Sequence, residues 1–266
     1  MLPESFVKVE RDGPITVVII TRTERSNALH AAAHFQLARI FDEFEADPTA
    51  LVAIITGEGD RSFCAGNDLK AQAEGGPMER PASGFAGLTK RRNRTKPIIA
   101  AVNGIALGGG FEIVLACDLA VAAPNARFAL PEVRLGLVPL AGMHLLPRQV
   151  GPKNALALLL NAKALGAEEA LSLGLINEIT AEKGALDAAK VLARRIIRGS
   201  PTAIATCLDI TRQSLSTPDV FDALDGRYES LELLCASPDF IEGPKSFAEK
   251  RPPVWATTRK GKKRKG

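Results

Sequence analysis

The sequence predicts an α/β fold followed by a helical C-terminal region. Short apolar and β-branched runs alternate with segments in which apolar residues recur every three or four positions, which is typical of alternating strands and helices. Long helical patterns follow. The chain has 266 residues, 46 % hydrophobic and 24 % charged. That composition excludes a disordered or fibrous protein and fits one large domain with an appendage.

The elements are expected in the following order. Apolar, β-branched runs predict strands at 17–20, 51–56, 97–105 and 119–123. Helical spacing and flanking Pro or Gly residues predict helices at 28–46, 111–116, 152–160, 167–173, 182–200 and 202–235. Residues 71–87 are rich in Gly, Pro, Ala and Glu and show little periodicity. We expect a mobile surface loop there.

The positive net charge of +4 comes from the C-terminus. Residues 259–266 carry six Lys and Arg side chains, and subtracting six from +4 leaves −2 for the rest. We therefore predict an α/β core at 1–199, a helical region at 200–256 and a disordered basic tail at 257–266. The charge of the folded part does not favour nucleic-acid binding.

Other patterns exclude several classes of protein. No apolar run is long enough to span a membrane, and residues 1–10 lack a secretory signal pattern, so we expect a cytoplasmic protein. The four cysteines show no CxxC spacing and are expected to be reduced, mostly buried thiols. His30 and His34 lie four apart without a third ligand, which favours a helix surface over a metal site.

Two glycine-containing turns follow predicted apolar segments. Gly108-Gly109-Gly110 precedes a helical pattern, and Cys64-Ala65-Gly66-Asn67-Asp68 forms the second turn. Each turn could present one backbone N–H group to the same developing oxyanion. Close packing alone would also explain the glycines, and the spacing does not decide between the two interpretations.

Two carboxylates stand in apolar surroundings. Glu112 follows the triple glycine, and Glu132 lies in Leu130-Pro131-Glu132-Val133. Two carboxyl groups that face one water can divide the acid and base roles, because proximity separates their pKa values. Singly, each is better explained as a structural glutamate paired with Arg127 or Arg134. Asp118 is better explained as a cap or buried hydrogen-bonding group.

The chain resembles the crotonase family, that is, enoyl-CoA hydratase/isomerase. The resemblance extends over nearly the whole sequence and is carried by the segments 26–29, 62–69, 96–104, 108–112, 126–132, 135–139 and 247–251. Within the family the pattern is most similar to carnitinyl-CoA dehydratase-like members. The stretch 140–148 departs from the family pattern, being one residue shorter with Gly142 alone retained, and this bears on the pocket shape and the position of Glu132.

The resemblance implies a fold of repeated ββα units with two near-perpendicular sheets and a C-terminal helical region that supports a homotrimer or a dimer of trimers. It implies an acyl-CoA thioester substrate, no metal and no other cofactor. By position it assigns the catalytic roles to Glu112 and Glu132 and the oxyanion-hole N–H groups to Asn67 and Gly109. It assigns contacts with the substrate or CoA to Arg25, Ala28, Ala65, Asp68, Leu69, Lys70, Phe247 and Lys250.

The expected activity is an enoyl-CoA hydratase-type hydro-lyase, which adds water across the 2,3 double bond of an enoyl-CoA. One alternative keeps the fold and changes the reaction, to dehydration of carnitinyl-CoA or another β-hydroxyacyl-CoA, or to double-bond isomerisation. The other alternative is a non-catalytic homologue that binds CoA esters or RNA, to which the basic tail could contribute.

Overall fold

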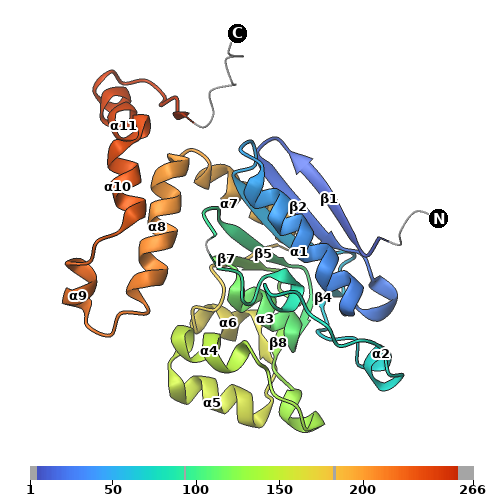
Figure 1. Cartoon of the computed structure of the whole chain (residues 1–266). Coiled ribbons are helices and arrows are strands. Elements are labelled where there is room, and N and C mark those ends of the chain that lie inside the picture. The colour runs from blue at the N-terminus through green and yellow to red at the C-terminus, as the bar shows by residue number, and fades with distance from the viewer. Residues whose placement is uncertain (1–4, 93, 182–183, 257–266) are drawn as a thin grey trace.

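The computed structural model describes residues 5–92, 94–181 and 184–256. Two sheets and the helices around them form an α/β body, and the last helices extend away from it (Figure 1). No described helix is both long and apolar enough for a membrane span.

The larger sheet has six strands. Their order is β1 (Val7–Asp12), β2 (Ile15–Ile20), β3 (Val52–Gly57), β5 (Ile98–Val102), β7 (Leu119–Ala122) and β10 (Glu178–Ile179). β1 and β2 form an antiparallel pair, and the other neighbours are parallel. The strands expected at 17–20, 51–56 and 119–123 are confirmed to within a few residues. β1 was not predicted, because it has only two apolar residues and all but Val7 are exposed or half-buried.

The smaller sheet has four strands. Their order is β4 (Ser62–Cys64), β6 (Ile105–Leu107), β8 (Arg127–Ala129) and β9 (Leu165–Gly166), and β4, β6 and β8 are parallel. The consecutive strands β3 and β4, β5 and β6, and β7 and β8 therefore each place one member in the large sheet and one in the small sheet. This is the repeated ββ pairing that the resemblance implied.

The strand expected at 97–105 is wrong in its extent. It ends at Val102, and Ile105 already belongs to the small sheet. The Asn103 side chain donates to the carbonyl oxygens of Gly57 and Gly59, at 2.8 and 2.7 Å. A Cβ on Gly104 would lie 2.4 Å from the Arg61 carbonyl, so only glycine permits this change of sheet.

Helices cover both faces of the large sheet. Those of the body are α1 (Ala31–Ala46), α2 (Leu69–Ala73), α3 (Gly109–Ala116), α4 (Gly142–Val150), α5 (Pro152–Asn161), α6 (Ala167–Ser172) and α7 (Ala185–Ile196). Three short 3₁₀ turns lie at Thr23–Arg25, Phe85–Gly87 and Glu132–Leu135. Leu37, Phe41 and Phe44 of α1 pack in one apolar core, and the alanines of α7 pack against Ile54 and Ile99 in a second core.

Most predicted helices of the body are confirmed, with two corrections around α1. The helix begins at Ala31 and not at residue 28, and His34 is buried, not on the helix surface. His34 Nδ1 accepts a hydrogen bond from the Ala86 N–H at 3.1 Å. That contact lies in the segment predicted to be a mobile surface loop. Phe85, Ala86 and Leu88 are in fact buried in the main core, so the end of that prediction is wrong.

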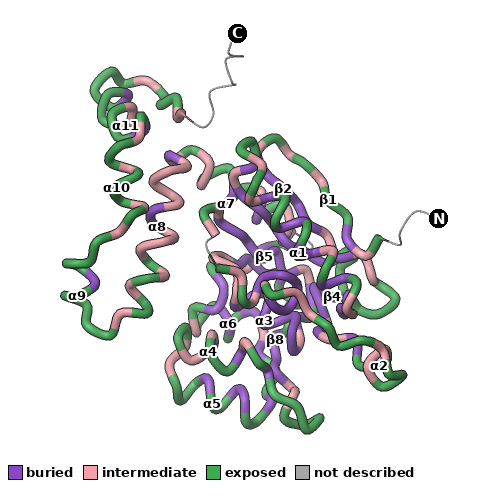
Figure 2. The backbone as a smooth tube through the Cα atoms, in the orientation of Figure 1, coloured by how far each residue is buried: buried purple, intermediate pink, exposed green. Residues whose placement is uncertain are grey.

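The C-terminal helices leave the body after Ser200. They are α8 (Pro201–Ser214), α9 (Val220–Leu224), α10 (Glu229–Ala236) and α11 (Pro238–Ala248). The single helical segment expected at 202–235 is therefore broken twice, at Thr217-Pro218 and Asp225-Gly226. Figure 2 shows these helices largely exposed or half-buried, in contrast to the buried sheets. The domain division at 199/200 stays a prediction, and the tail 257–266 lies outside the described residues.

All four cysteines are free, but the expectation of mostly buried thiols holds for only part of the set. Cys64 is buried and Cys117 is half-buried, whereas Cys207 and Cys235 are exposed on α8 and α10. Burial raises the pKa of the Cys64 thiol and of the Cys117 thiol to about 12. Both therefore stay protonated and uncharged at neutral pH.

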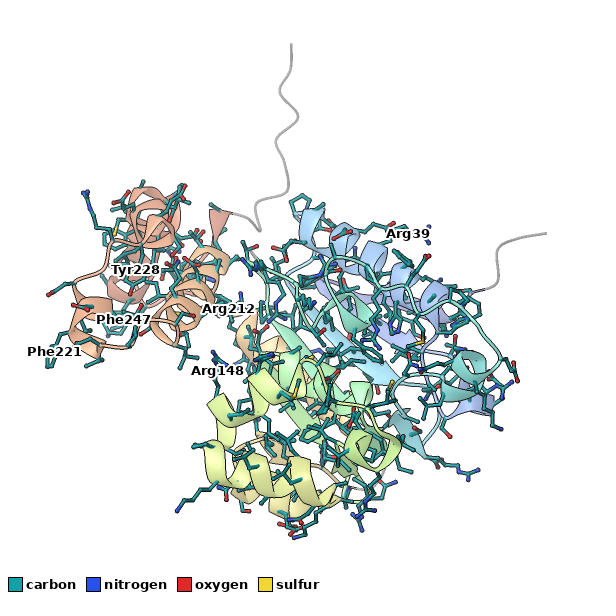
Figure 3. All side chains as sticks on the ribbon, turned by 60° about the horizontal axis from the view of Figure 1, so that its bottom comes forward. Arg39, Arg148, Arg212, Phe221, Tyr228 and Phe247 are labelled. Atoms are coloured by element: carbon teal, nitrogen blue, oxygen red, sulfur yellow. The ribbon has the colours of Figure 1, made fainter. Side chains whose placement is uncertain are left out.

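Asp118 ties α8 to the large sheet. Its Oδ1 lies 3.0 Å from Arg94 Nη2 and 2.7 Å from Arg212 Nη2, and its Oδ2 accepts from the Ile98 N–H at 2.9 Å. In Figure 3, Arg212 lies between the C-terminal helices and the body. Asp118 is thus a largely buried hydrogen-bonding group, which agrees with the second of the two roles that the sequence indicated.

We predict that Asp118→Asn destabilises the fold. Arg94 is largely buried, and burial lowers its pKa, so loss of the facing charge should cost on the order of 3 kcal/mol in the free energy of unfolding. Denaturant titration measures the change. The matched control is Asp42→Asn, since Asp42 pairs with Arg91 at the surface and its loss should cost less than about 1 kcal/mol. If both substitutions lowered the free energy of unfolding by the same small amount, a structural role for Asp118 would be contradicted.

Candidate active site

Three turns meet at the same edge of the small sheet. β4 is followed by Ala65-Gly66-Asn67, β6 by Gly108-Gly109, and β8 by the 3₁₀ turn that begins at Glu132. Because β4, β6 and β8 are parallel neighbours, their carboxyl ends lie side by side. A Cβ on Gly66 would lie 3.1 Å from the Gly109 nitrogen, so the first two turns are in contact.

The N–H groups of Asn67 and Gly109 are available to a ligand. Within the described parts of the chain, neither group donates to a protein acceptor. Leu29 and Asn67 form a single parallel bridge, in which Leu29 N–H donates to Gly66 and Asp68 N–H donates to Leu29. Gly109 is the first residue of α3, where N–H groups have no partner within the helix. Two unpaired donors next to each other can hold one oxyanion.

The triple glycine also serves close packing. A Cβ on Gly110 would lie 1.9 Å from the Cys64 carbonyl oxygen, and one on Gly109 would lie 2.3 Å from the Phe85 ring. Gly108 has φ +54°, in the region that favours glycine. Close packing of the glycines is therefore confirmed. The same packing leaves the Gly109 N–H unpaired, and its role in an oxyanion hole stays a prediction.

Glu112 is held by the start of α4. It lies in the first turn of α3, with 4 % of its surface exposed. Its Oε1 accepts from the N–H groups of Ala141 and Gly142, at 2.8 and 2.9 Å. These donors fix the side chain without engaging Oε2. The ion pair considered for it is not formed, because Arg134 donates to the Asn161 carbonyl and Arg127 to that of Ala126.

The short stretch 140–148 therefore acts on Glu112. Pro139 and Leu140 line the cavity, and the next two residues supply the N–H groups that bind Oε1. We expected the departure of residues 140–148 from the family pattern to affect the pocket, and the position of these residues beside the cavity is consistent with that expectation. The carboxylate whose position it determines is Glu112, not Glu132.

Glu132 is half-buried and has no such partners. Its Oε2 has no hydrogen-bond partner among the described residues, and a Cβ on Gly108 would lie 3.0 Å from its Oε1. Burial, with a smaller contribution from the negative charge of Glu112, raises the pKa of Glu132 to about 7. Two carboxyl groups in one site thus differ in environment, one hydrogen-bonded and one desolvated.

One cavity of about 400 Å³ connects these groups. Both glutamates and the two residues with unpaired N–H groups line it, together with Ala65 and Leu69, which the resemblance placed against substrate or CoA. Its other lining residues are Gln72, Met78, Arg80, Phe85, Gly108, Pro131, Leu135, Gly136, Leu137, Val138, Pro139 and Leu140.

The remaining residues predicted to bind CoA lie outside this lining. Asp68 caps α2 through the Ala71 N–H and pairs with Arg22 at 3.0 Å. Arg22 is therefore engaged inside the fold. Arg25 and Lys70 are exposed, and Ala28 is buried. Their contacts with CoA stay predictions.

Phe247 and Lys250 lie at the end of α11, far along the chain from the cavity. Phe247 is 87 % exposed. Figure 3 shows it on the C-terminal helices, apart from the body that holds the glutamates. Contact of these two residues with CoA also stays a prediction.

Sequence reasoning missed the side of the cavity formed by Gln72, Met78, Arg80 and Phe85. All four fall within 71–87, where Gly and Pro content indicated a surface loop. A signal was present in Gly84-Phe85-Ala86-Gly87-Leu88, because an aromatic and an aliphatic residue between glycines are atypical of an exposed loop.

The chain is similar to known proteins over most of its length. Residues 10–258 match the enoyl-CoA hydratase/isomerase family. A carnitinyl-CoA dehydratase of Citrobacter koseri is 42 % identical over 251 residues, which cover 92 % of this chain and 96 % of that protein. The carnitinyl-CoA dehydratase of Escherichia coli K12 is 42 % identical over 252 residues, with the same coverage.

Solved structures are also similar. An enoyl-CoA hydratase from Mycobacterium tuberculosis H37Rv has a TM-score of 0.88 and 39 % identity, covering 96 % of this chain and 100 % of that one. A carnitinyl-CoA hydratase from Mycobacterium avium has a TM-score of 0.76 and 38 % identity, covering 95 % and 99 %. The fold and site define a crotonase-type protein, and the chain belongs to the enoyl-CoA hydratase/isomerase family.

We predict that Glu132 titrates near pH 7 and that Glu112→Gln lowers this pKa. The substitution removes the neighbouring negative charge but leaves burial, the larger cause, so the pKa should stay above its ordinary value of 4.5. Carboxyl ¹³C NMR of glutamate-labelled protein measures it. Glu168→Gln, an exposed change on α6, should have no effect. A Glu132 signal that titrates near 4.5 would contradict the desolvated environment.

Proposed function

We propose that the protein is a hydro-lyase that adds water across the 2,3 double bond of an enoyl-CoA thioester and catalyses the reverse dehydration. The observation that supports this most directly is the convergence of four groups on one cavity. Two are carboxyl groups in different environments, Glu112 and Glu132, and two are the unpaired N–H groups of Asn67 and Gly109.

The proposed reaction begins with polarisation of the thioester. Its carbonyl oxygen accepts hydrogen bonds from Asn67 and Gly109, so negative charge can accumulate there as water attacks the β-carbon. Glu112, as carboxylate, takes a proton from that water. Glu132, as acid, gives a proton to the α-carbon, and the electron pair returns from the oxygen. Glu112 has gained one proton and Glu132 has lost one, so the pair keeps its total.

The environments of the two carboxyl groups support this division of roles. The Oε1 atom of Glu112 is fixed by two N–H donors. A pKa of about 7 for Glu132 keeps a substantial fraction of that group protonated at neutral pH. An acid poised near the working pH is effective in proton transfer. The mechanism uses only groups of this chain and calls for no metal or other cofactor.

A related function keeps the same machinery and changes the physiological direction. The curated relatives at 42 % identity are named carnitinyl-CoA dehydratases, which favours a β-hydroxyacyl-CoA as the starting compound. An isomerase would use one carboxylate for both proton transfers. Measuring the product formed from a set of 2-enoyl, 3-enoyl and 3-hydroxyacyl-CoA esters separates the three reactions.

The exposed C-terminal helices support a proposed homotrimer or dimer of trimers. α8 to α11 carry many exposed apolar side chains, among them Phe221, Leu224 and Phe247, and such a surface is typical of an interface. In that assembly Phe247 and Lys250 would reach the CoA of a neighbouring subunit. A cytoplasmic location and the lack of a nucleic-acid partner stay predictions.

A non-catalytic RNA-binding homologue is the competing function. The basic residues that suggested it lie at 259–266, outside the described residues. Salt-dependent RNA binding that disappears when 259–266 is deleted, without turnover of any enoyl-CoA, would favour that function over ours.

We predict that Glu112→Gln and Glu132→Gln each lower kcat for hydration of crotonyl-CoA by about 10²–10⁴-fold, because each removes one proton-transfer group. Hydration removes the conjugated double bond, so loss of the ultraviolet absorbance of the enoyl thioester measures the rate directly. Glu168→Gln, on the exposed face of α6, is the matched control. Retention of most activity in either active-site variant would contradict the assigned roles.

We predict that kcat/KM for hydration and dehydration falls in parallel above about pH 7. Both directions need one proton on the glutamate pair, and water addition consumes no net proton, so their pH dependence must be the same. As pH rises through the pKa of Glu132, about 7, that proton is lost and the rate should fall about tenfold per pH unit.

Glu132→Gln should abolish this descending limb in its residual activity, whereas Glu168→Gln should retain it. A wild-type profile that is flat between about pH 6 and pH 9 would show that Glu132 does not supply the proton.

A further inference from the structure

Arg80 gives the cavity a positive charge that the proposed mechanism does not use. Of the described residues that line the cavity, it is the one with a cationic side chain. The ion pairs and side-chain hydrogen bonds found within the described chain do not include Arg80, and its side chain is half-buried. The guanidinium is therefore available to a ligand and is charged at every physiological pH.

Phe85 supports this guanidinium. The Arg80 Cζ atom lies 5.3 Å from the centroid of the Phe85 ring, within range of a cation–π interaction. The ring itself is only 3 % exposed, because it packs over Gly109 and meets the His34 ring edge-on at 4.4 Å. Arg80 thus lies over an aromatic ring that is anchored in the core next to Gly109.

His34 adds no charge behind this wall. Burial, and to a smaller extent the charge of Arg80, lowers the pKa of His34 to about 3. Its Nδ1 accepts from the Ala86 N–H, as the neutral imidazole requires. The positive potential on this side of the cavity is therefore due to Arg80 and does not change near neutral pH.

A quaternary ammonium group fits this cavity poorly. Carnitinyl esters, after which the curated relatives are named, carry such a permanent cation, and proteins hold it against several aromatic faces. Here Phe85 is the aromatic member of the described lining, and Arg80 covers it. The chain has one Trp and one Tyr. Trp255 follows α11 and Tyr228 precedes α10, and Figure 3 shows Tyr228 apart from the body.

We propose that the acyl group turned over at this site ends in a carboxylate, which Arg80 binds, so that the substrate class is the CoA monothioesters of unsaturated dicarboxylic acids. The proposal rests on the proposed function and specifies its substrate. The neutral double bond lies at the glutamates and the oxyanion donors, and the charged end lies against Arg80. A hydrogen-bonded ion pair between Arg80 and a carboxylate is stronger than a hydrogen bond to a neutral group. A ligand with a positive charge at the same end would be repelled by Arg80.

The first experiment compares kcat/KM within pairs of enoyl-CoA esters that have nearly the same shape. One pair is glutaconyl-CoA, which ends in a carboxylate, and its terminal amide. The other is crotonobetainyl-CoA, which ends in trimethylammonium, and the neutral analogue in which carbon replaces that nitrogen. The wild-type protein should favour the carboxylate over the amide, and the neutral analogue over the ammonium, by about tenfold in each pair.

Arg80→Gln should bring both ratios to within about twofold of one, and Arg80→Lys, which keeps the charge, should retain part of each preference. Arg39→Gln is the matched control, because Arg39, labelled in Figure 3, is exposed on α1 and does not line the cavity. It should leave both ratios as in the wild type. Equal losses on carboxylate and amide in Arg80→Gln would place Arg80 against the CoA phosphates and overturn the proposal.

A binding measurement tests the same point without catalysis. Calorimetric Kd values are compared for glutaryl-CoA and its terminal amide, which have no double bond to hydrate. Glutaryl-CoA should bind the wild type about tenfold more tightly than its amide does, and Arg80→Gln should lose this difference. That result supports carboxylate binding by Arg80 whether or not any ester is turned over. Absence of turnover would reject the hydratase function alone. Equal binding of the two ligands by the wild type, or equal turnover of crotonobetainyl-CoA and its neutral analogue, overturns the proposal.

Discussion

The parallel pairing of β4, β6 and β8 is the constraint on which the site depends. Each of these strands has only three residues, yet each ends where the chain must supply a functional group. Parallel neighbours end at a common edge, so the Asn67, Gly109 and Glu132 turns meet although up to 65 residues separate them in the sequence. Close approach of backbone makes this possible, at Gly104 against Arg61 and at Gly110 against Cys64. A side chain at Gly104 would force away the Arg61 backbone that precedes β4, and one at Gly110 would force α3, which carries the Gly109 N–H, away from β4.

The fourth group, Glu112, depends on a different element. Its side chain is fixed by the start of α4, whose first N–H groups would otherwise lack partners. The buried Oε2 atom of Glu132 has no such donor among the described residues, and Glu132 lines the same cavity as the segment from Leu135 to Leu140. The same cavity thus holds one carboxyl group bound by N–H groups and one that is desolvated. This difference in environment, rather than any difference in residue type, separates an acid from a base.

Local pattern predicted much of the body. The spacing of Leu37, Phe41 and Phe44 predicted α1, and the β-branched runs predicted β2, β3 and β7, because these elements bury one face or a whole strand. The resemblance placed the two glutamates and the two oxyanion turns, which line one cavity. The sequence could not show that His34 is buried or that Phe85 forms a wall, because both depend on one contact between α1 and a Gly-rich segment 52 residues away. The partners of Glu112, 29 and 30 residues away, were hidden for the same reason.

The groups proposed to react with the double bond and the residue proposed to bind the end of the acyl group lie in different parts of the fold. The two glutamates and the two N–H donors belong to turns that the small sheet fixes, whereas Arg80 belongs to a segment without a strand, held through Phe85. Coulomb energy falls with distance and rises where water is excluded. A charge at the far end of the acyl chain therefore acts mainly with Arg80 and little with the reacting atoms. On the proposed function, a change at this one residue of the 71–87 segment would alter which acyl group is accepted and leave the groups proposed to add water in place.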